Sequence, residues 1–380
     1  MAAKKAAGGR EPAQAPSYYG ACVPGLEECI AEFLAERFPD LSISRIMSGA
    51  IVFETSCPYD RFNLFCFNNV FQVTGRAPVQ ESGRDVLERF VLNTLRRRAG
   101  EELLAAFSAG SRERSFRVIF SLENTPAALN GELRSRTETY IASCSGLRVN
   151  RSNPGVEFWF LLRREGAFFL RRLTRHRPWD KLLHPGELPP PLAWVLCRLS
   201  APRPGERIAD PFCGYGAIPL ARLRYFPQAE FFASDIDGRV LAAARAKFGE
   251  TVPRLCHFNR LDAAELPRLI PPASLDSVIT DPPWGCYRGS SPGARNGPKK
   301  PNTMGRPDVT GTAEERARSA GERYNQFLGI CAGLLKPGGR VVMLCGREGE
   351  PNAERNGFTL VRRIPILLSG KKAAIYVLRI

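Results

Sequence analysis

The chain has 380 residues, 44% of them hydrophobic, and its 54 Lys and Arg exceed its 38 Asp and Glu, giving a net charge of +16. This length predicts two or three globular domains, and the charge favours a polyanionic partner: RNA, DNA or an acidic membrane surface. No stretch is apolar over about 20 residues and the N-terminus lacks a signal-peptide core, so we expect a cytoplasmic protein without a membrane span. The cysteines form no CxxC pair, so we expect neither a metal site nor a disulfide framework.

The first 80 residues predict a disordered tail followed by a small domain. Residues 1–16 are small, polar and proline-containing, which is typical of disorder. From residue 17 to residue 80 the pattern is strand, helix, strand, strand, helix, strand, which is the order of a ferredoxin-like domain. We expect its strands at 18–23, 41–47, 51–55 and 70–75, and its helices at 26–38 and 57–65.

Residues 84–177 predict a second α+β domain that is rich in arginine. We expect helices at 85–99 and 126–144, a strand at 116–122, and a hairpin formed by 156–162 and 167–173. Alternate residues of a strand share a face, so the arginines of the hairpin could gather into one phosphate-binding patch. The candidate RNA-binding residues here are Arg163, Arg164, Arg171, Arg172, Arg175 and Arg177.

A proline-rich segment, residues 178–191, reads as a linker to a third domain, residues 192–380. In this domain short apolar strands alternate with helices, which predicts a Rossmann-like α/β sheet. Two strands close the chain at 360–367 and 374–380, and we expect them to form an antiparallel hairpin. His176 and His184 invite a general-base role, but histidines in a basic linker are more often solvated.

A glycine turn between the first strand and first helix of this domain predicts a nucleoside-bearing cofactor. Gly214 and Gly216 follow Asp210 in DPFCGYGAI, and the free N–H groups of the next helix point toward the turn. Asp235 closes the second strand, where such folds place a carboxylate on ribose hydroxyls. Pro219 stands where a third glycine is expected, which argues against NAD and FAD.

The tetrapeptide Asp281, Pro282, Pro283 and Trp284 follows an apolar strand and predicts an amine-binding site. An exocyclic amine of a base or amide is a poor nucleophile, because its lone pair is delocalised. The Asp281 carboxylate and the Pro282 carbonyl can accept its protons, while Trp284 offers an aromatic face for stacking. The basic segment 288–306, which contains Lys299 and Lys300, comes next and could close over a nucleotide or be a disordered insertion.

The order DPFCGYGAI, SDID, LDA and DPPWG resembles class I S-adenosylmethionine-dependent amino-methyltransferases. Over nearly the whole chain the resemblance is to THUMP-domain RNA methyltransferases that act on the guanine exocyclic amine, in stretches such as GLEECIAEFL and NPGVEFWFLLRREGAFFLRRLTRH. It implies a THUMP-like RNA-binding domain at 84–177 and N2-methylation of guanosine in tRNA. The implied cofactor is S-adenosylmethionine, with Asp262 on its adenine. The cofactor-binding candidates are Asp210, Pro211, Cys213, Gly214, Gly216, Asp235, Ile236 and Asp262.

Several alternatives stay open from the residues alone. The same motif suits a guanine or adenine of ribosomal RNA, or a glutamine side-chain amide in a protein. A non-catalytic RNA-binding protein is a further class, although the glycines, Asp235 and the DPPW tetrapeptide are all intact. We expect RNA, in particular tRNA, as partner and a monomeric protein.

Overall fold

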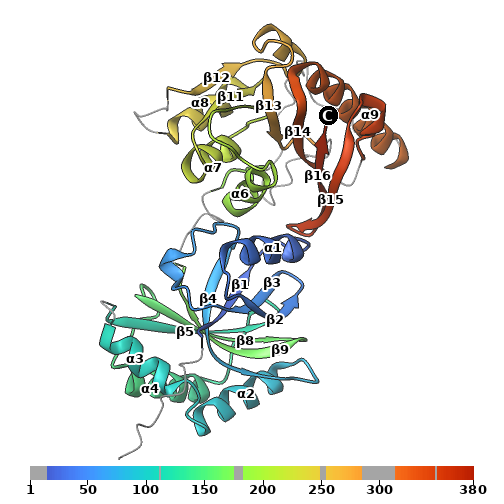
Figure 1. Ribbon diagram of the computed structural model, residues 1–380. Helices are drawn as coiled ribbons and strands as arrows, with labels where there is room; N and C mark the ends of the chain where they lie inside the picture. Colours follow the sequence, from blue (N-terminus) through green and yellow to red (C-terminus); the bar gives the residue numbers. More distant parts are fainter. Residues whose placement is uncertain (1–14, 111–112, 175–182, 249–253, 285–312, 347–348) are drawn as a thin grey trace, which may run out of the picture. The chain divides into compact units, whose positions relative to one another are not determined.

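The computed structural model describes residues 15–110, 113–174, 183–248, 254–284, 313–346 and 349–380. The chain divides into two compact units (Figure 1). The first contains Met1–Cys22 and Glu27–His176, and the second contains Val23–Leu26 and Arg177–Ile380. Each unit is built on one β-sheet. Within the described part of the chain, no helix is long and apolar enough to cross a bilayer.

The first unit contains nine strands and four α-helices among its described residues. Its strands are β1 (Ser17–Ala21), β2 (Ser42–Met47), β3 (Ala50–Glu54), β4 (Asn69–Ala77), β5 (Ser115–Leu122), β6 (Thr125–Pro126), β7 (Arg148–Val149), β8 (Val156–Arg163) and β9 (Gly166–Arg172). Its helices are α1 (Glu27–Arg37), α2 (Arg84–Arg96), α3 (Glu101–Gly110) and α4 (Gly131–Ser145), with a 3-10 turn η1 (Tyr59–Arg61).

One continuous sheet joins the two segments that the sequence predicts as separate domains. Its strand order is β2-β3-β1-β4-β9-β8-β5-β6, with β7 beside β5. The ferredoxin-like segment, 17–80, and the THUMP-like segment, 84–177, meet where β4 pairs with β9, from Phe71 opposite Arg172 to Ala77 opposite Ala167. The predicted hairpin of β8 and β9 is confirmed, with Arg163 opposite Gly166 at its turn.

The second helix of the ferredoxin-like pattern is reduced to the single 3-10 turn η1. Pro58 precedes the turn in an extended conformation, and Asn63 adopts a φ of 51° just after it, so a longer helix is interrupted at both ends. Burial is achieved without the helix. The Phe62 ring packs edge-on against Tyr18, with centroids 4.9 Å apart.

The predicted helix at 85–99 corresponds to α2, which ends at Arg96, and a second helix that no sequence pattern predicted, α3, follows it. Gly100, with a φ of 80°, separates them. The predicted helix at 126–144 begins later, because Pro126 pairs in β6 and Asn130 caps α4 by accepting a hydrogen bond from the Glu132 amide. These helices cover a core made by β5, β8 and β9. Its largest rings are Phe116, Phe120, Phe158, Phe160 and Phe169.

The second unit contains the α/β sheet. Its strands are β10 (Glu206–Asp210), β11 (Ala229–Asp235), β12 (Cys256–Arg260), β13 (Leu275–Thr280), β14 (Leu335–Gly346), β15 (Thr359–Leu368) and β16 (Lys371–Arg379). Its helices are α6 (Pro190–Leu199), α7 (Ala217–Tyr225), α8 (Gly238–Ala246) and α9 (Ala313–Leu334), with 3-10 turns η2 (Ala263–Arg268) and η3 (Glu354–Asn356). Helix α6 begins two residues inside the predicted linker, because proline is tolerated in a first helical turn.

The sheet of the second unit has the order β12-β11-β10-β13-β14-β16-β15. The first five strands are parallel, and β16 runs antiparallel to both β14 and β15, which confirms the predicted terminal hairpin. Helix α9 and η2 pack on one face, over a core that includes Ala209, Val278 and Met343. Helices α6, α7 and α8 lie on the side away from α9 (Figure 1). The order reverses between β10 and β13, where ligands bind in such sheets.

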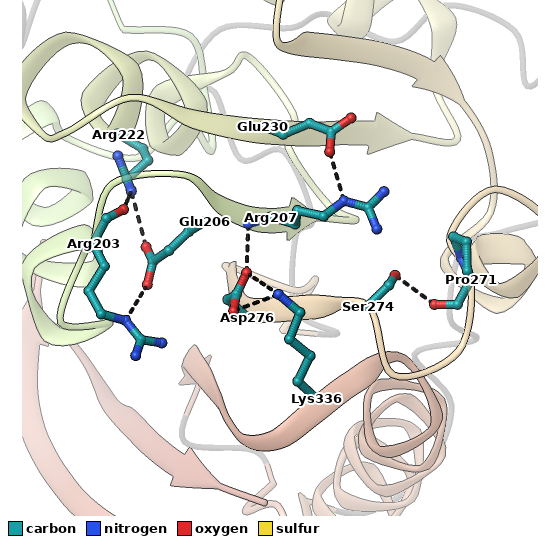
Figure 2. Close-up of polar contacts among 9 residues, drawn as sticks. All are labelled: Arg203, Glu206, Arg207, Arg222, Glu230, Pro271, Ser274, Asp276 and Lys336. Atoms are coloured by element: carbon teal, nitrogen blue, oxygen red, sulfur yellow. Dashed lines mark hydrogen bonds and ion pairs between the residues drawn. The ribbon is translucent and has the colours of Figure 1, made fainter.

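A lysine turn is inserted into β14 at the amino end of the sheet. Leu335 pairs with Leu275 and Arg340 pairs with Ser277, so residues 336–339 bulge opposite the single residue Asp276. The Lys336 ammonium lies 2.9 Å from both Asp276 carboxylate oxygens, and one of these also accepts the Arg207 amide (Figure 2). The sequence KPGG, residues 336–339, thus forms a turn within an otherwise continuous strand.

A buried ion pair lies at the same edge of the sheet (Figure 2). The side chains of Arg222, on α7, and Glu206, at the start of β10, are 0% and 4% exposed and lie 3.1 Å apart. Arg222 also donates to the carbonyl oxygens of Pro227 and Arg203, and Glu206 accepts from the Arg203 side chain. These bonds attach α7, which follows the glycine turn, to the first strand of the parallel sheet.

We predict that Glu206→Ala lowers the free energy of unfolding by about 3 kcal/mol, because it leaves the Arg222 charge buried without its partner. Urea unfolding of the full chain measures the change. The matched control is Glu265→Ala, whose partner Arg268 is 78% exposed, and its effect should stay below about 1 kcal/mol. Equal effects of the two substitutions would show that the buried pair does not hold α7.

Candidate active site

Three aspartates meet at the carboxyl edge of the parallel strands. Asp210 is the last residue of β10, Asp235 is the last residue of β11, and Asp281 directly follows β13. Strands β10 and β13 are neighbours at the reversal of strand order, and the Thr280 hydroxyl bridges them by donating to Asp210 Oδ1 at 2.7 Å. The structure therefore brings the glycine turn and the DPPW tetrapeptide, about 70 residues apart in sequence, to one edge.

The Asp235 side chain, at the end of β11, accepts hydrogen bonds from two backbone amides, one of which belongs to the glycine turn. The Gly214 amide donates to Asp235 Oδ2 and the Asp237 amide donates to Asp235 Oδ1, both at 2.9 Å. Gly216 precedes α7 with a φ of 79°, and a Cβ there would lie 2.9 Å from the Ala244 Cβ. The residue must therefore be glycine for both conformation and space. Asp235 keeps lone pairs for a ligand, because a carboxylate offers about four acceptor sites.

Asp210 is a buried carboxyl group with one unsatisfied oxygen. Its side chain belongs to a residue that is 1% exposed. Oδ1 accepts from Thr280 and from the Phe212 amide, whereas Oδ2 has no hydrogen-bond partner among the described residues. Burial raises the pKa of Asp210 to about 8, and the charges of Asp281 and Asp235 add to this effect. Such a group attracts a cationic ligand, which would satisfy Oδ2 and restore the charge.

The remaining cofactor candidates surround this edge in different ways. Pro211 and Cys213 are buried within the turn, and the Cys213 amide donates to the Ser234 carbonyl at 2.9 Å. Ile236 is 59% exposed beside Asp235, so it presents an apolar side chain for a planar ligand. Asp262 caps η2 by accepting from the Ala264 amide at 2.9 Å. Its exposed carboxylate keeps an oxygen available for a second role.

The DPPW tetrapeptide is held by its own tryptophan. Trp284 is 5% exposed, and its indole Nε1 donates to Asp281 Oδ1 at 2.8 Å. Asp281 is partly exposed, Pro282 is buried and Pro283 is exposed. Burial raises the pKa of Asp281 to about 7, although the Trp284 hydrogen bond opposes the shift. The open aromatic face expected of Trp284 is not presented to solvent.

The arginine patch expected on the hairpin is not a free surface. Arg163 is 5% exposed and donates to the Tyr19 hydroxyl at 3.0 Å and to the Ser48 carbonyl. The Arg172 side chain lies 2.9 Å from Glu157 and is 11% exposed. Burial lowers the pKa of Arg171. Strands β8 and β9 lie in the middle of the sheet, so their long cations need internal partners, whereas Arg164, after β8 in the hairpin turn, is exposed.

Several predicted residues lie outside the described part of the chain. These are Arg175, His176, Arg177, Lys299 and Lys300, together with most of the tail, the first part of the linker and the basic segment 288–306. His184 is described and stacks on Tyr215 of the glycine turn, with ring centroids 4.1 Å apart. His184 is exposed, as expected of a linker histidine, and its ring also contacts the glycine turn.

Sequence reasoning missed a second group of arginines in the first unit. Arg114, Arg148 and Arg151 line an open cleft of about 840 Å³ at the edge where β7 pairs with β5. All three are exposed. They are separated by up to 37 residues (151 − 114), so only the parallel pairing of β5 and β7 brings them together. No local periodicity predicts this cluster.

This chain is similar to several known methyltransferases. Residues 177–295 match a family model described as UPF0020, RMKL-like, methyltransferase domain. The tRNA (guanine(6)-N2)-methyltransferase of Thermus thermophilus is 30% identical over 60% of this chain and 62% of its own length. The tRNA (guanine(10)-N2)-dimethyltransferase of Methanothermobacter thermautotrophicus is 29% identical over 41% of this chain and 49% of its own. The chain thus spans about half to three fifths of these relatives.

A solved structure extends the likeness to the whole fold. TrmN from Thermus thermophilus superposes with a TM-score of 0.67 at 24% identity, covering 96% of this chain and 99% of its own. This likeness confirms the predicted fold class, an α+β N-terminal half followed by a class I methyltransferase fold. The family match lies within the unit that holds the three aspartates. Residues 177–295 are therefore similar to the methyltransferase domain that this family model describes.

Proposed function

We propose that this protein transfers a methyl group from S-adenosylmethionine to the exocyclic amine of guanine in RNA, most specifically in tRNA. The observation that carries the proposal is the Asp281 carboxyl group, fixed by the Trp284 indole at the strand reversal beside the glycine turn. The family match at 177–295 and the tRNA guanine-N2 activity named for two relatives support it. A tRNA substrate favours a cytoplasmic location.

The residues at the carboxyl edge fit this cofactor. S-adenosylmethionine supplies an activated methyl group on a sulfonium and also carries an ammonium group. Asp210, whose Oδ2 has no partner among the described residues, would bind the ammonium group in the glycine turn. Asp235 would bind the ribose hydroxyls, Ile236 would cover the adenine, and Asp262 would accept its amino group. A cationic ligand suits this cluster of three carboxyl groups, because its charge favours their ionised forms.

Asp281 would act on the target base mainly by positioning it. The carboxylate accepts a hydrogen bond from the guanine amine through the oxygen that Trp284 leaves available, and the Pro282 carbonyl accepts the other proton. The amine lone pair is then directed at the methyl group. Transfer from a sulfonium needs no strong base, because the product ammonium is acidic. A base within a helical stem must be extruded to reach this edge.

The first unit would hold the RNA. The cleft lined by Arg114, Arg148 and Arg151 is exposed and basic, and guanidinium groups bind phosphate. The Arg151 guanidinium already pairs with Glu138 through two hydrogen bonds, so we assign the phosphate contacts to Arg114 and Arg148. Methylation of a glutamine amide suits the same tetrapeptide, but a protein substrate does not explain the basic cleft. Methylation of ribosomal RNA or of an adenine N6 differs from the proposal only in the nucleotide that reaches Asp281. The protein is proposed to act as a monomer.

The first prediction concerns the product. Incubation with labelled methyl donor and total RNA, followed by digestion to nucleosides, should place the label in N2-methylguanosine, and separation of the RNA by class should place it in tRNA. Asp281→Asn should lower turnover about 100-fold, since an amide presents donors as well as an acceptor to the amine. Binding of S-adenosylmethionine, measured by calorimetry, should persist. Label in adenosine or in protein would refute the substrate.

The second prediction concerns Asp210. Its folded pKa of about 8 lies above the ordinary value of 3.8, so the folded state holds the proton more tightly. The contribution of this group to the stability of the unliganded protein should therefore be fully present at low pH and decline as pH rises toward 8. Between pH 5.5 and pH 8 the decline due to this group is about 3 kcal/mol.

Asp210→Asn should remove that part of the decline, which thermal unfolding at several pH values measures. It should also weaken S-adenosylmethionine binding, since the amide cannot pair with an ammonium group. Asp276→Asn is the matched control, because Asp276 pairs with Lys336 at the opposite edge. An Asp210→Asn protein with the parental pH dependence would contradict the proposed burial of this carboxyl group.

The third prediction concerns RNA binding. Arg114→Gln with Arg148→Gln should weaken RNA affinity and lower the slope of log affinity against log salt by roughly 1.5, because each lost phosphate contact contributes about 0.7–0.9. Filter binding across a salt series measures it. Arg268→Gln with Arg355→Gln removes the same charge from exposed positions of the second unit and should leave the slope nearly unchanged. Equal slopes in both double variants would place RNA elsewhere.

A further inference from the structure

The burial of Trp284 indicates a role other than stacking on a base. An aromatic residue that stacks on an incoming base must present a ring face to solvent, whereas Trp284 is only 5% exposed. Its one polar atom, Nε1, is directed at Asp281 Oδ1 at 2.8 Å. The geometry is that of a side chain that fixes the orientation of a neighbouring carboxylate.

Gly346 provides the space in which the indole lies. It is the last residue of β14, it is buried, and its backbone does not adopt a positive φ. A Cβ built at Gly346 would lie 2.8 Å from the Trp284 Cβ and 2.9 Å from the indole Cδ2 and Cγ atoms. Side chains do not approach so closely, so any larger residue would displace the indole. Space, and not backbone conformation, requires glycine here.

The surroundings of Asp281 make its orientation consequential. Among the described residues, the ionisable groups that interact with its charge are Asp210 on β10, Tyr324 on α9 and Cys345 on β14. None of these carries a positive charge, and each is buried. Only the Trp284 hydrogen bond counteracts the burial that favours the protonated form of Asp281. The indole N–H thus favours the ionised form of Asp281 and fixes the orientation of its carboxyl group.

We propose that Trp284 and Gly346 form a positioning pair for Asp281, in which Gly346 seats the indole and the indole N–H holds the carboxylate toward the target amine. The proposal rests on the proposed function, because it assigns Asp281 to that amine. It makes Gly346, 62 residues after Trp284 (346 − 284) and on a different strand, a determinant of turnover. Trp284 acts through Asp281 and not by stacking on the base.

Trp284→Phe separates the two roles, because phenylalanine keeps an aromatic face but has no N–H. The positioning role predicts that kcat falls while KM for RNA is unchanged. It also predicts that the acid limb of the profile of kcat against pH moves up by about one pH unit, so that kcat at pH values below the limb falls about tenfold. A stacking role predicts a parental pH profile. An unchanged acid limb with kcat within about twofold of the parent would overturn the proposal.

Gly346→Ala tests the pair from its other member. It should displace the indole and reproduce the loss of kcat and the shifted acid limb, with cofactor binding retained. Gly333→Ala is the matched control, because a Cβ at Gly333, on α9, meets nothing within 4 Å. It should leave turnover unchanged. Thermal unfolding of each variant shows whether it is folded, and a folded Gly346→Ala protein with parental kinetics would contradict the pair.

A measurement without RNA distinguishes failure of this proposal from failure of the proposed function. Tryptophan emission of the parent should show a step near pH 7, as Asp281 loses its proton beside the indole. The step should vanish in Trp284→Phe and in Asp281→Asn. If no methylated guanosine forms but the step behaves in this way, the substrate is wrong and the positioning pair stands. If the step persists in Trp284→Phe, the pair is refuted whatever the substrate.

Discussion

A carboxyl group buried between two parallel strands, Asp210, is the constraint on which the second unit depends. It ends β10, and through Thr280 it is bonded to the end of β13, so the glycine turn and the DPPW tetrapeptide cannot move independently. Its second oxygen has no partner among the described residues. A buried carboxyl group in this state destabilises the unliganded fold, and a cationic ligand relieves that cost. Ligand binding and folding are thereby coupled at one atom.

The opposite edge of the same strands carries satisfied charges. Glu206 begins the strand that Asp210 ends, and its ion pair with Arg222 is fully buried and hydrogen-bonded. Asp276 similarly begins the strand that precedes Asp281, and it pairs with Lys336. Among the described residues of the second unit, the unpaired carboxyl oxygen therefore lies at the edge that we propose as the ligand site, while ion pairs join the strands at the far edge. The same division separates stability from function in other parallel sheets.

The sequence predicts the second unit well and the arginines of the first unit poorly. Strand ends at Asp210, Asp235 and Asp281 follow from local patterns, because parallel strands place their carboxyl ends at one edge. The partners of Arg163 do not follow, since Tyr19 and Ser48 are more than a hundred residues away. The short η1 was missed because helical spacing of apolar residues persists even where Pro58 and Asn63 interrupt the helix. Local sequence patterns predict helices and strands. Whether an arginine side chain is buried depends instead on strands that are distant in the sequence but adjacent in the sheet.

The indole of Trp284 shows why motif chemistry alone does not assign roles. The residue type permits both stacking and hydrogen bonding, and only the position of Gly346 on β14 decides between them. Since β14 pairs with β13, the end of one strand provides the space into which the loop after the other folds back. The motif is thus completed by a residue without a side chain. A substitution that adds one methyl group at that position would act on the proposed target amine through two contacts, first to the indole and then to Asp281.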